Sequence, residues 1–180
     1  GYTSRIDLGL MPGLARFFGN GTSVNEFGAG MGCYTDALRR EGIRVRAYEG
    51  APGIANITQG LVRQADLTTT LDTPTRAWSL CLEVAEHIPA EHEARFLANL
   101  DAANRQGIVL SWSATTRGTG HINARSGEYV SDAMRKLGYE EDTAASRTLQ
   151  HAVSTFKWFK PGFERSHGGG VRVWRRRGQQ

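Results

Sequence analysis

The sequence predicts an α/β fold, in which a mostly parallel sheet of seven strands is doubly wound, with helices on both faces. Apolar runs of four to six residues alternate with amphipathic stretches along nearly the whole chain, and this alternation is typical of parallel strands separated by helices. One such run enters a turn with three alternate glycines, Gly28, Gly30 and Gly32, just before a helical stretch. The length of 180 residues suits one domain with a single core.

Each expected strand is a short apolar or β-branched run that ends at a turn or a polar residue. We expect strands at residues 23–27, 44–48, 61–65, 77–82, 107–112, around 139 and at 171–174. The expected helices lie between these strands and carry apolar residues at helical spacing. They cover residues 35–40, 54–60, about 89–104 and 129–137. Periodicity does not predict the order of the strands in the sheet.

Three segments lie outside this alternation. Residues 1–20 are expected to form an N-terminal extension, and residues 143–162 a helical insertion that ends in an aromatic cluster. Residues 175–180 are expected to form a solvated basic tail beyond the last strand. The chain starts without Met, so we expect it to be processed or to be part of a longer, multidomain protein.

The net charge of +4 is concentrated near the C-terminus, where Arg175, Arg176 and Arg177 are adjacent. Of the 22 basic residues, these three leave 19 against 18 acidic residues, so the composition does not favour a nucleic-acid partner. No apolar run reaches the ~20 residues needed to span a bilayer. We therefore expect no membrane partner.

The two cysteines, Cys33 and Cys81, lie inside apolar segments without the CxxC spacing. We expect buried thiols rather than a disulfide or metal ligands, which suits the reducing cytoplasm. The five histidines also lack paired ligand spacing, since His87 and His92 are neither three nor four residues apart. The sequence therefore predicts no metal site.

The glycine turn allows a ligand to approach the backbone closely, because its glycines have no side chains. A dinucleotide fingerprint requires a small residue where Cys33 stands, and a phosphate loop requires a Gly-Lys-Ser/Thr sequence that is absent. Glu49 follows the second expected strand, where its carboxylate can accept hydrogen bonds from both ribose hydroxyls of a nucleoside. The alternative is a tight turn followed by a solvated acid.

Four segments, in order and at domain-sized spacing, resemble class I S-adenosylmethionine (SAM) methyltransferases: residues 26–32 (EFGAGMG), Glu49, residues 65–67 (ADL) and residues 81–89 (CLEVAEHIP). The resemblance covers about residues 20–112. It implies a Rossmann-like fold, SAM as the cofactor and methyltransferase activity. It also implies that the cofactor contacts Glu26, Gly28, Ala29, Gly30, Glu49, Gly50, Asp66, Leu67, Glu83 and Val84.

The segment at residues 118–125, with Tyr129 and Val130 after it, looks like a branch of methyltransferase-like proteins found in green algae and large algal viruses. Some members of that branch resemble modules joined to sugar-processing domains. This resemblance agrees with a chain that starts without Met. We expect a small-molecule or glycan acceptor, and we place O-methylation of a carbohydrate hydroxyl first because the segments after the fifth expected strand combine aromatic and polar side chains that suit a sugar ring.

An alcohol acceptor loses its proton near the transition state of methyl transfer, so a positioned histidine or carboxylate is the natural general base. His87 and His121 are the candidate catalytic residues, because both follow the carboxyl ends of central strands, where open parallel sheets bind ligands. Either can instead be a helix-cap or loop histidine. Glu86 is expected to cap a helix or to orient a neighbouring group.

Trp112, Asn123 and Arg125 are the candidate substrate-binding residues, since a flat apolar face beside polar groups suits a sugar ring. The alternative is that these aromatic side chains fill the core, and for Trp112 we favour that alternative. Two other function classes stay open: a nicotinamide-dependent oxidoreductase, which shares the fold and the ribose acid, and a non-catalytic SAM- or RNA-binding module. Cys33 and the segment at residues 83–87 count against the oxidoreductase.

Overall fold

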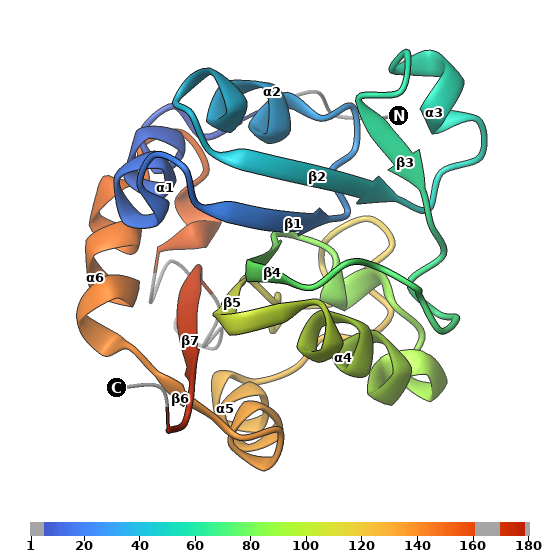
Figure 1. Ribbon diagram of the computed structural model, residues 1–180. Coiled ribbons are helices and arrows are strands. Elements are labelled where there is room, and N and C mark those ends of the chain that lie inside the picture. Colours follow the sequence, from blue (N-terminus) through green and yellow to red (C-terminus); the bar gives the residue numbers. More distant parts are fainter. Residues whose placement is uncertain (1–5, 161–169, 179–180) are drawn as a thin grey trace.

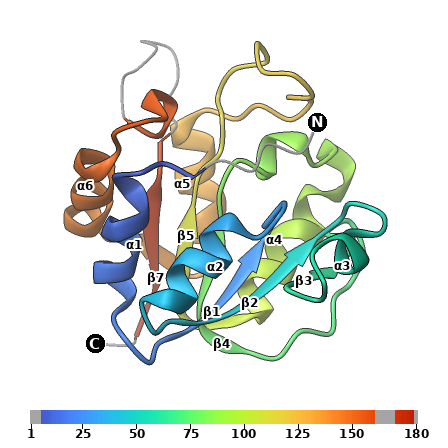
Figure 2. The ribbon, with the colours of Figure 1, turned by 90° about the horizontal axis from the view of Figure 1, so that it is seen from above.

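The computed structural model describes residues 6–160 and 170–178. Within them, seven strands form one sheet in the order β3-β2-β1-β4-β5-β7-β6 (Figures 1 and 2). The strand β7 runs antiparallel to both of its neighbours, and the other pairs are parallel. The strands are β1 (Ser23–Phe27), β2 (Arg44–Glu49), β3 (Val62–Gln64), β4 (Arg76–Cys81), β5 (Asn104–Leu110), β6 (Tyr139–Glu141) and β7 (Arg172–Arg176). The predicted Rossmann-like α/β class is confirmed.

Helices cover both faces of the sheet (Figures 1 and 2). One face carries α1 (Leu10–Phe18), α2 (Cys33–Arg40) and α6 (Thr143–Ala152). The other face carries α4 (Glu93–Ala102) and α5 (Gly127–Lys136). The short helix α3 (Ile54–Ile57) packs beside β3, at the edge of the sheet.

The alternation of side chains along the strands builds both cores. In β5, Ile108 and Leu110 pack with α4 and α5, whereas Val109 between them packs with α1, α2 and α6. This is the period of two that a strand covered on both faces requires. A buried apolar run in the sequence is therefore shared between two cores.

The expected elements are found within a few residues of their predicted bounds, with one informative difference. The expected helix at about 89–104 is shorter, because a 3-10 turn, η2 (Ala90–His92), precedes α4. At its other end the chain already enters β5 at Asn104, which pairs with Arg76 of β4. Two further 3-10 turns are η1 (Ala85–His87) and η3 (Lys157–Phe159).

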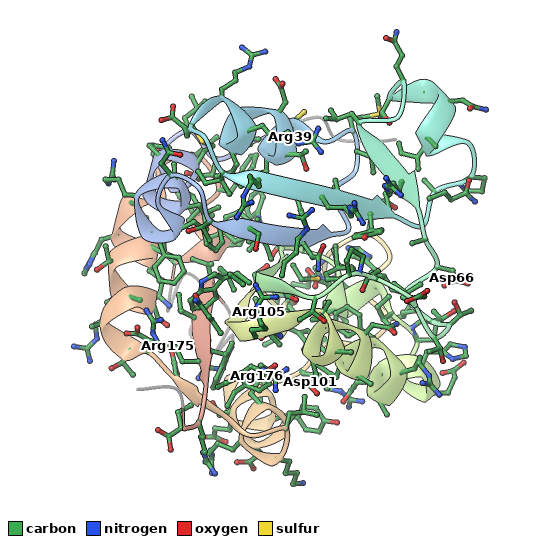
Figure 3. The ribbon with its side chains drawn as sticks, viewed as in Figure 1. Arg39, Asp66, Asp101, Arg105, Arg175 and Arg176 are labelled. Carbon is green, nitrogen blue, oxygen red and sulfur yellow. The ribbon has the colours of Figure 1, made fainter. Side chains whose placement is uncertain are left out.

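Arg175 and Arg176 do not belong to a basic tail, and the prediction for residues 175–180 is corrected here. Both lie in β7, and each pairs with a residue of a neighbouring strand. Their guanidinium groups form ion pairs with Asp142 at 2.7 Å and Asp101 at 2.8 Å, and Figure 3 shows Arg176 beside Asp101. The charges are thus held in the sheet by acidic partners. Residues 179–180 lie outside the described residues.

The first helix is fastened to the segment that follows α6. Asp7 accepts a hydrogen bond from the Leu10 N–H at 2.7 Å, and it also accepts the N–H groups of Thr155 and Phe156 at 2.7 and 2.6 Å. The expected extension and the expected insertion therefore pack together; residues 161–162 of the latter lie outside the described residues. None of the described helices is long and apolar enough to cross a membrane.

Candidate functional site

A pocket lies where β1, β2, β3 and β4 end, at the sheet edge where parallel α/β proteins bind ligands. Its volume is about 300 Å³, which suits a small-molecule site. The lining residues are Gly28, Glu49, Gly50, Asp66, Leu67, Glu83, Val84, His87 and Ile88. All of them except Ile88 are predicted site residues, so the fold brings these separate segments together around one cavity.

The glycine turn after β1 closes one side of the pocket. Gly28 has φ +74°, and a Cβ at this position would lie 2.0 Å from Val84 Cγ2. The N–H groups of Gly28 and Ala29 both donate to the Tyr48 carbonyl, at 2.8 and 3.0 Å. Gly30 has φ +53°, and a Cβ there would meet open space. The turn is therefore fixed against β2 and leaves room beside its backbone.

Glu49 ties the end of β2 to the glycine turn. Its Oε2 accepts a hydrogen bond from the Gly30 N–H at 2.9 Å, and its Oε1 accepts one from the Ala51 N–H at 3.1 Å. A carboxylate oxygen can accept two hydrogen bonds. The backbone thus orients Glu49 while both of its oxygens keep capacity for hydroxyl donors of a ligand.

Asp66 lies in the loop after β3. Its Oδ1 accepts hydrogen bonds from the Thr68 N–H at 2.9 Å and from the Thr68 hydroxyl at 2.7 Å. The hydroxyl and then the N–H lower the pKa of Asp66, so this group is ionised at neutral pH. Within the described residues its Oδ2 has no hydrogen-bond partner, which leaves one oxygen for a ligand.

Glu83 follows β4 in a left-handed backbone conformation, with φ +58°. Ser111, after β5, holds it there: the Ser111 Oγ accepts the Glu83 N–H and donates to Glu83 Oε1, both at 2.8 Å. Burial and the nearby carboxylate of Glu86 raise the pKa of Glu83 to about 7. Strained backbone of this kind persists where its surroundings enforce it, as they do at many functional sites.

The pocket is acidic. Glu49, Asp66 and Glu83 contribute carboxyl groups, and none of the described residues that line it is a lysine or an arginine. Because opposite charges attract more strongly in a partly desolvated site, this lining favours a cationic ligand with hydroxyl donors.

Three predicted cofactor residues, Glu26, Ala29 and Gly30, are not among the lining residues. Glu26 is buried, and its carboxylate accepts a hydrogen bond from the Thr35 hydroxyl of α2. Burial raises the pKa of Glu26 to about 7, against the lowering effect of that hydrogen bond and of Arg39. Glu26 thus joins β1 to α2 beside the glycine turn.

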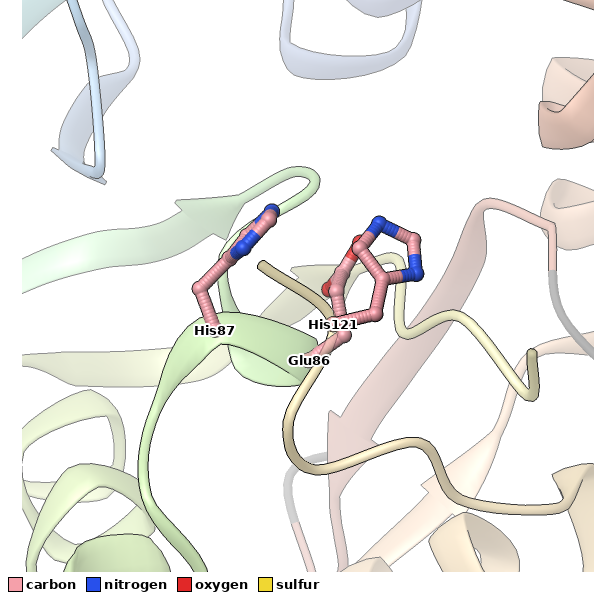
Figure 4. A group of neighbouring side chains, drawn as sticks. All are labelled: Glu86, His87 and His121. Atoms are coloured by element: carbon pink, nitrogen blue, oxygen red, sulfur yellow. The ribbon is translucent and has the colours of Figure 1, made fainter. Parts of the chain in front are cut away.

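Glu86, His87 and His121 converge next to the pocket (Figure 4). Glu86 and His87 belong to η1, and His121 lies in the loop between β5 and α5. The His121 Nε2 is 3.9 Å from Glu86 Oε1, and the centres of the two imidazole rings are 5.0 Å apart. Burial raises the pKa of Glu86 to about 7, although its own N–H and that of Ser113 act to lower it. The spacing in the sequence gave no indication of this cluster.

The predicted substrate residues are largely engaged inside the protein. Trp112 and Asn123 are buried; the Trp112 Nε1–H donates to the Asn123 carbonyl at 2.7 Å, and the Asn123 amide donates to Glu93 at 3.0 Å. Arg125 pairs with Glu93 at 2.8 Å and stays partly exposed. In this structure neither the Trp112 nor the Asn123 side chain is exposed, and a role of these residues in substrate binding stays a prediction. No pattern in the sequence points to Glu93 as the group that joins them.

Several solved structures are similar to this chain. A TehB-like SAM-dependent methyltransferase from Corynebacterium glutamicum has a TM-score of 0.68 and 14% identity, over 93% of this chain and 86% of that one. Magnesium protoporphyrin IX methyltransferase from Synechocystis PCC 6803, with bound SAM, has a TM-score of 0.66 and 15% identity, over 93% and 76%. The [4+2]-cyclase SpnF has a TM-score of 0.63 and 12% identity, over 93% and 79%.

At these identities the likeness shows the fold alone, and that fold serves both methyltransferases and a cyclase. A scan against protein-family models finds no match, and a search of the curated proteins finds none either. The similarity to the algal and viral branch stays a prediction. The activity therefore has to be argued from the site.

Proposed function

We propose that this protein is a SAM-dependent methyltransferase that transfers a methyl group to a hydroxyl of a small-molecule or glycan acceptor. The observation that carries the proposal is the acidic pocket framed by the glycine turn, Glu49 and Asp66. The likeness to solved SAM-dependent methyltransferases supports it. When bound, SAM supplies an electrophilic methyl group on a positively charged sulfur.

The pocket residues fit a nucleoside that carries a sulfonium group. Glu49 offers two oxygens to the ribose hydroxyls, and Asp66 offers one to an adenine amino group. Gly28 and Gly30 let the ligand approach the backbone. Glu83 places a carboxyl group where β4 ends, and a cation beside it favours its ionised form.

Methyl transfer is an in-line displacement, and its barrier is lowered mainly by holding the acceptor oxygen and the methyl carbon in line. The acceptor oxygen forms a bond to the methyl carbon as the carbon–sulfur bond breaks, and the electron pair of that bond stays on sulfur. The acceptor proton passes to a base. His87 and His121 are the candidates, because each directs its Nδ1 to a backbone carbonyl and so leaves Nε2 to take the proton.

The surroundings of His121 support the proposed acceptor class. Gly118 and Gly120 precede this residue in the chain. Arg125 follows it and is partly exposed, so its guanidinium can donate a hydrogen bond to a polyol. A carbohydrate hydroxyl fits this donor. The two cysteines are free thiols, which suits a cytoplasmic protein.

Calorimetric titration with SAM and with NAD tests the cofactor. We expect micromolar binding of SAM and no binding of NAD. Gly30→Val is expected to abolish SAM binding, because the new side chain fills the space beside the turn. Gly138→Val is the matched control, since Gly138 also has a positive φ of +89° and open surroundings but lies between α5 and β6. Equal SAM affinities of the two variants would contradict the proposed loop.

Incubation with isotopically labelled SAM and a panel of sugars and polyols tests the reaction. Mass spectrometry should detect a labelled methyl group on a hydroxyl oxygen. SAM binding without transfer to any acceptor would instead favour a non-catalytic SAM-binding module.

A further inference from the structure

The cluster of Glu86, His87 and His121 combines one carboxylate and two imidazoles on separate segments. The ligand atoms that they offer lie within 4.8 Å of one another (Figure 4). The chain brings them together through its backbone: the N–H groups of Ile122 and Asn123 donate to the Glu86 carbonyl at 3.0 and 2.9 Å. These backbone hydrogen bonds fix the His121 loop against η1 independently of the side chains of the cluster.

The two imidazoles have the same orientation with respect to their hydrogen bonds. The His87 Nδ1 lies 2.9 Å from the Gly120 carbonyl, and the His121 Nδ1 lies 2.8 Å from the Thr115 carbonyl. A carbonyl only accepts, so each Nδ1 carries the hydrogen, and in the neutral ring Nε2 keeps a lone pair. Metal-binding histidines commonly hold the far nitrogen against a carbonyl in this way.

Glu86 supplies the independent observation. Its side chain is fully buried, and among the described residues neither carboxylate oxygen has a partner with hydrogen-bond geometry; the N–H groups of Glu86 and Ser113 lie close enough to lower its pKa but form no such bond. The His121 Nε2 at 3.9 Å is too far for a hydrogen bond. A buried acceptor without a well-aligned donor is costly, and here it lies close to two imidazoles that each offer a lone pair. A cation satisfies all three groups at once.

Two glycines make room for the two rings. A Cβ on Gly118 would lie 2.2 Å from the His121 Nε2, and a Cβ on Gly120 would lie 3.1 Å from the His87 Nδ1. A side chain at position 118 would displace the His121 imidazole, and one at position 120 would require the His87 ring to shift slightly. The two glycines therefore leave room for both imidazoles.

We propose that Glu86, His87 and His121 bind a divalent transition-metal ion of the Zn²⁺ type. Two imidazoles and one carboxylate are a donor set of catalytic zinc sites, and they leave at least one position open. Bonds of about 2.0–2.1 Å in a tetrahedral arrangement place neighbouring ligand atoms roughly 3.4 Å apart. The 3.9 Å between His121 and Glu86 has to shorten only slightly, and the exposed His87 ring is free to follow.

The cluster adjoins the pocket of the proposed cofactor, because His87 lines that pocket together with Glu83 and Val84. The role of the ion, unlike the site itself, rests on the proposed methyl transfer. A hydroxyl bound to the ion loses its proton to water more readily. The ion would then take the place of a histidine general base.

Zinc calorimetry on the full chain, freed of metal with a chelator, tests the site. We expect one Zn²⁺ per chain, a raised melting temperature with Zn²⁺, and an affinity that falls on the order of 100-fold or more in His121→Ala and Glu86→Gln. His151→Ala is the matched control, because this exposed histidine lies on α6. Co²⁺ is expected to give a visible absorption spectrum that His121→Ala alters and His151→Ala does not.

The proposal is overturned if the wild-type chain binds no Zn²⁺, or if all three variants bind it with equal affinity. Displacement of Zn²⁺ by millimolar Mg²⁺ would also overturn it, since a hard cation does not prefer imidazole. SAM titration of the same samples separates this outcome from the proposed function. Absent Zn²⁺ binding beside intact SAM binding removes the metal site alone.

Discussion

Replacement of Glu49 with alanine probes the proposed nucleoside site at its best-defined group. In the structure, Glu49 is oriented by the N–H groups of Gly30 at 2.9 Å and Ala51 at 3.1 Å, and it keeps lone pairs for two ribose hydroxyls. Loss of these acceptors at a partly solvated site is expected to cost ~1–3 kcal/mol of binding free energy. This corresponds to about a ten- to hundredfold weaker SAM affinity.

Isothermal calorimetry with SAM measures this loss directly, and thermal unfolding shows that each variant folds. Glu41→Ala is the matched control, because Glu41 is an exposed acid before the opposite end of β2. Glu49→Gln keeps one acceptor oxygen and is expected to fall between wild type and Glu49→Ala. Unchanged SAM affinity in Glu49→Ala would remove Glu49 from the site. It would also refute the argument that an acid at the end of β2 binds the ribose hydroxyls.

Two further predictions concern stability. Arg176→Ala is expected to lower the free energy of unfolding, measured by urea titration, by about 1–3 kcal/mol, because the Arg176 guanidinium binds Asp101 and the Asn104 carbonyl. Arg177→Ala is the control, since its partner Glu140 is exposed. This variant should change the free energy of unfolding by less than ~0.5 kcal/mol. Similar losses would argue against a structural role for Arg176. The pKa of Glu26 is raised to about 7 in the folded state, so the folded state binds its proton more tightly, and stability should fall between about pH 4.5 and pH 7. Glu26→Gln should remove this part of the pH dependence, by up to roughly 3 kcal/mol above pH 7; parallel pH–stability curves of wild type and variant would contradict it.

Local patterns in the sequence predict the elements of this fold but not their arrangement. The strand β1 and the turn after it follow from an apolar run and from glycines at positions of positive φ, such as Gly28 and Gly30. The position of β7 between β5 and β6 depends on long-range pairing. Arg175 and Arg176 show the consequence: two adjacent charges near the chain end are typical of a solvated tail, and only the fold places Asp142 and Asp101 beside them.

Some residues of the candidate site could be predicted from local sequence patterns, and others depend on long-range contacts. Glu49 and Asp66 could be predicted because Glu49 ends β2 and Asp66 follows β3, and the carboxyl ends of parallel strands meet at one edge of the sheet. The approach of His121 to Glu86 could not, because it depends on backbone hydrogen bonds from Ile122 and its neighbour to the Glu86 carbonyl. Backbone bonds of this kind leave no pattern in the side chains of the sequence.

Asn123 and Arg125 join the loop that carries His121 to α4. The carboxylate of Glu93, at the start of α4, accepts hydrogen bonds from Asn123, Arg125 and Tyr129. Burial acts to raise the pKa of Glu93, but these hydrogen bonds outweigh it and hold the pKa below its usual value, so the carboxylate is ionised at neutral pH. It therefore anchors the loop that carries His121 to α4 before any acceptor arrives. Because the backbone of the loop is held in this way, the proposed metal ion requires only a rotation of the His121 side chain. The backbone does not have to rearrange.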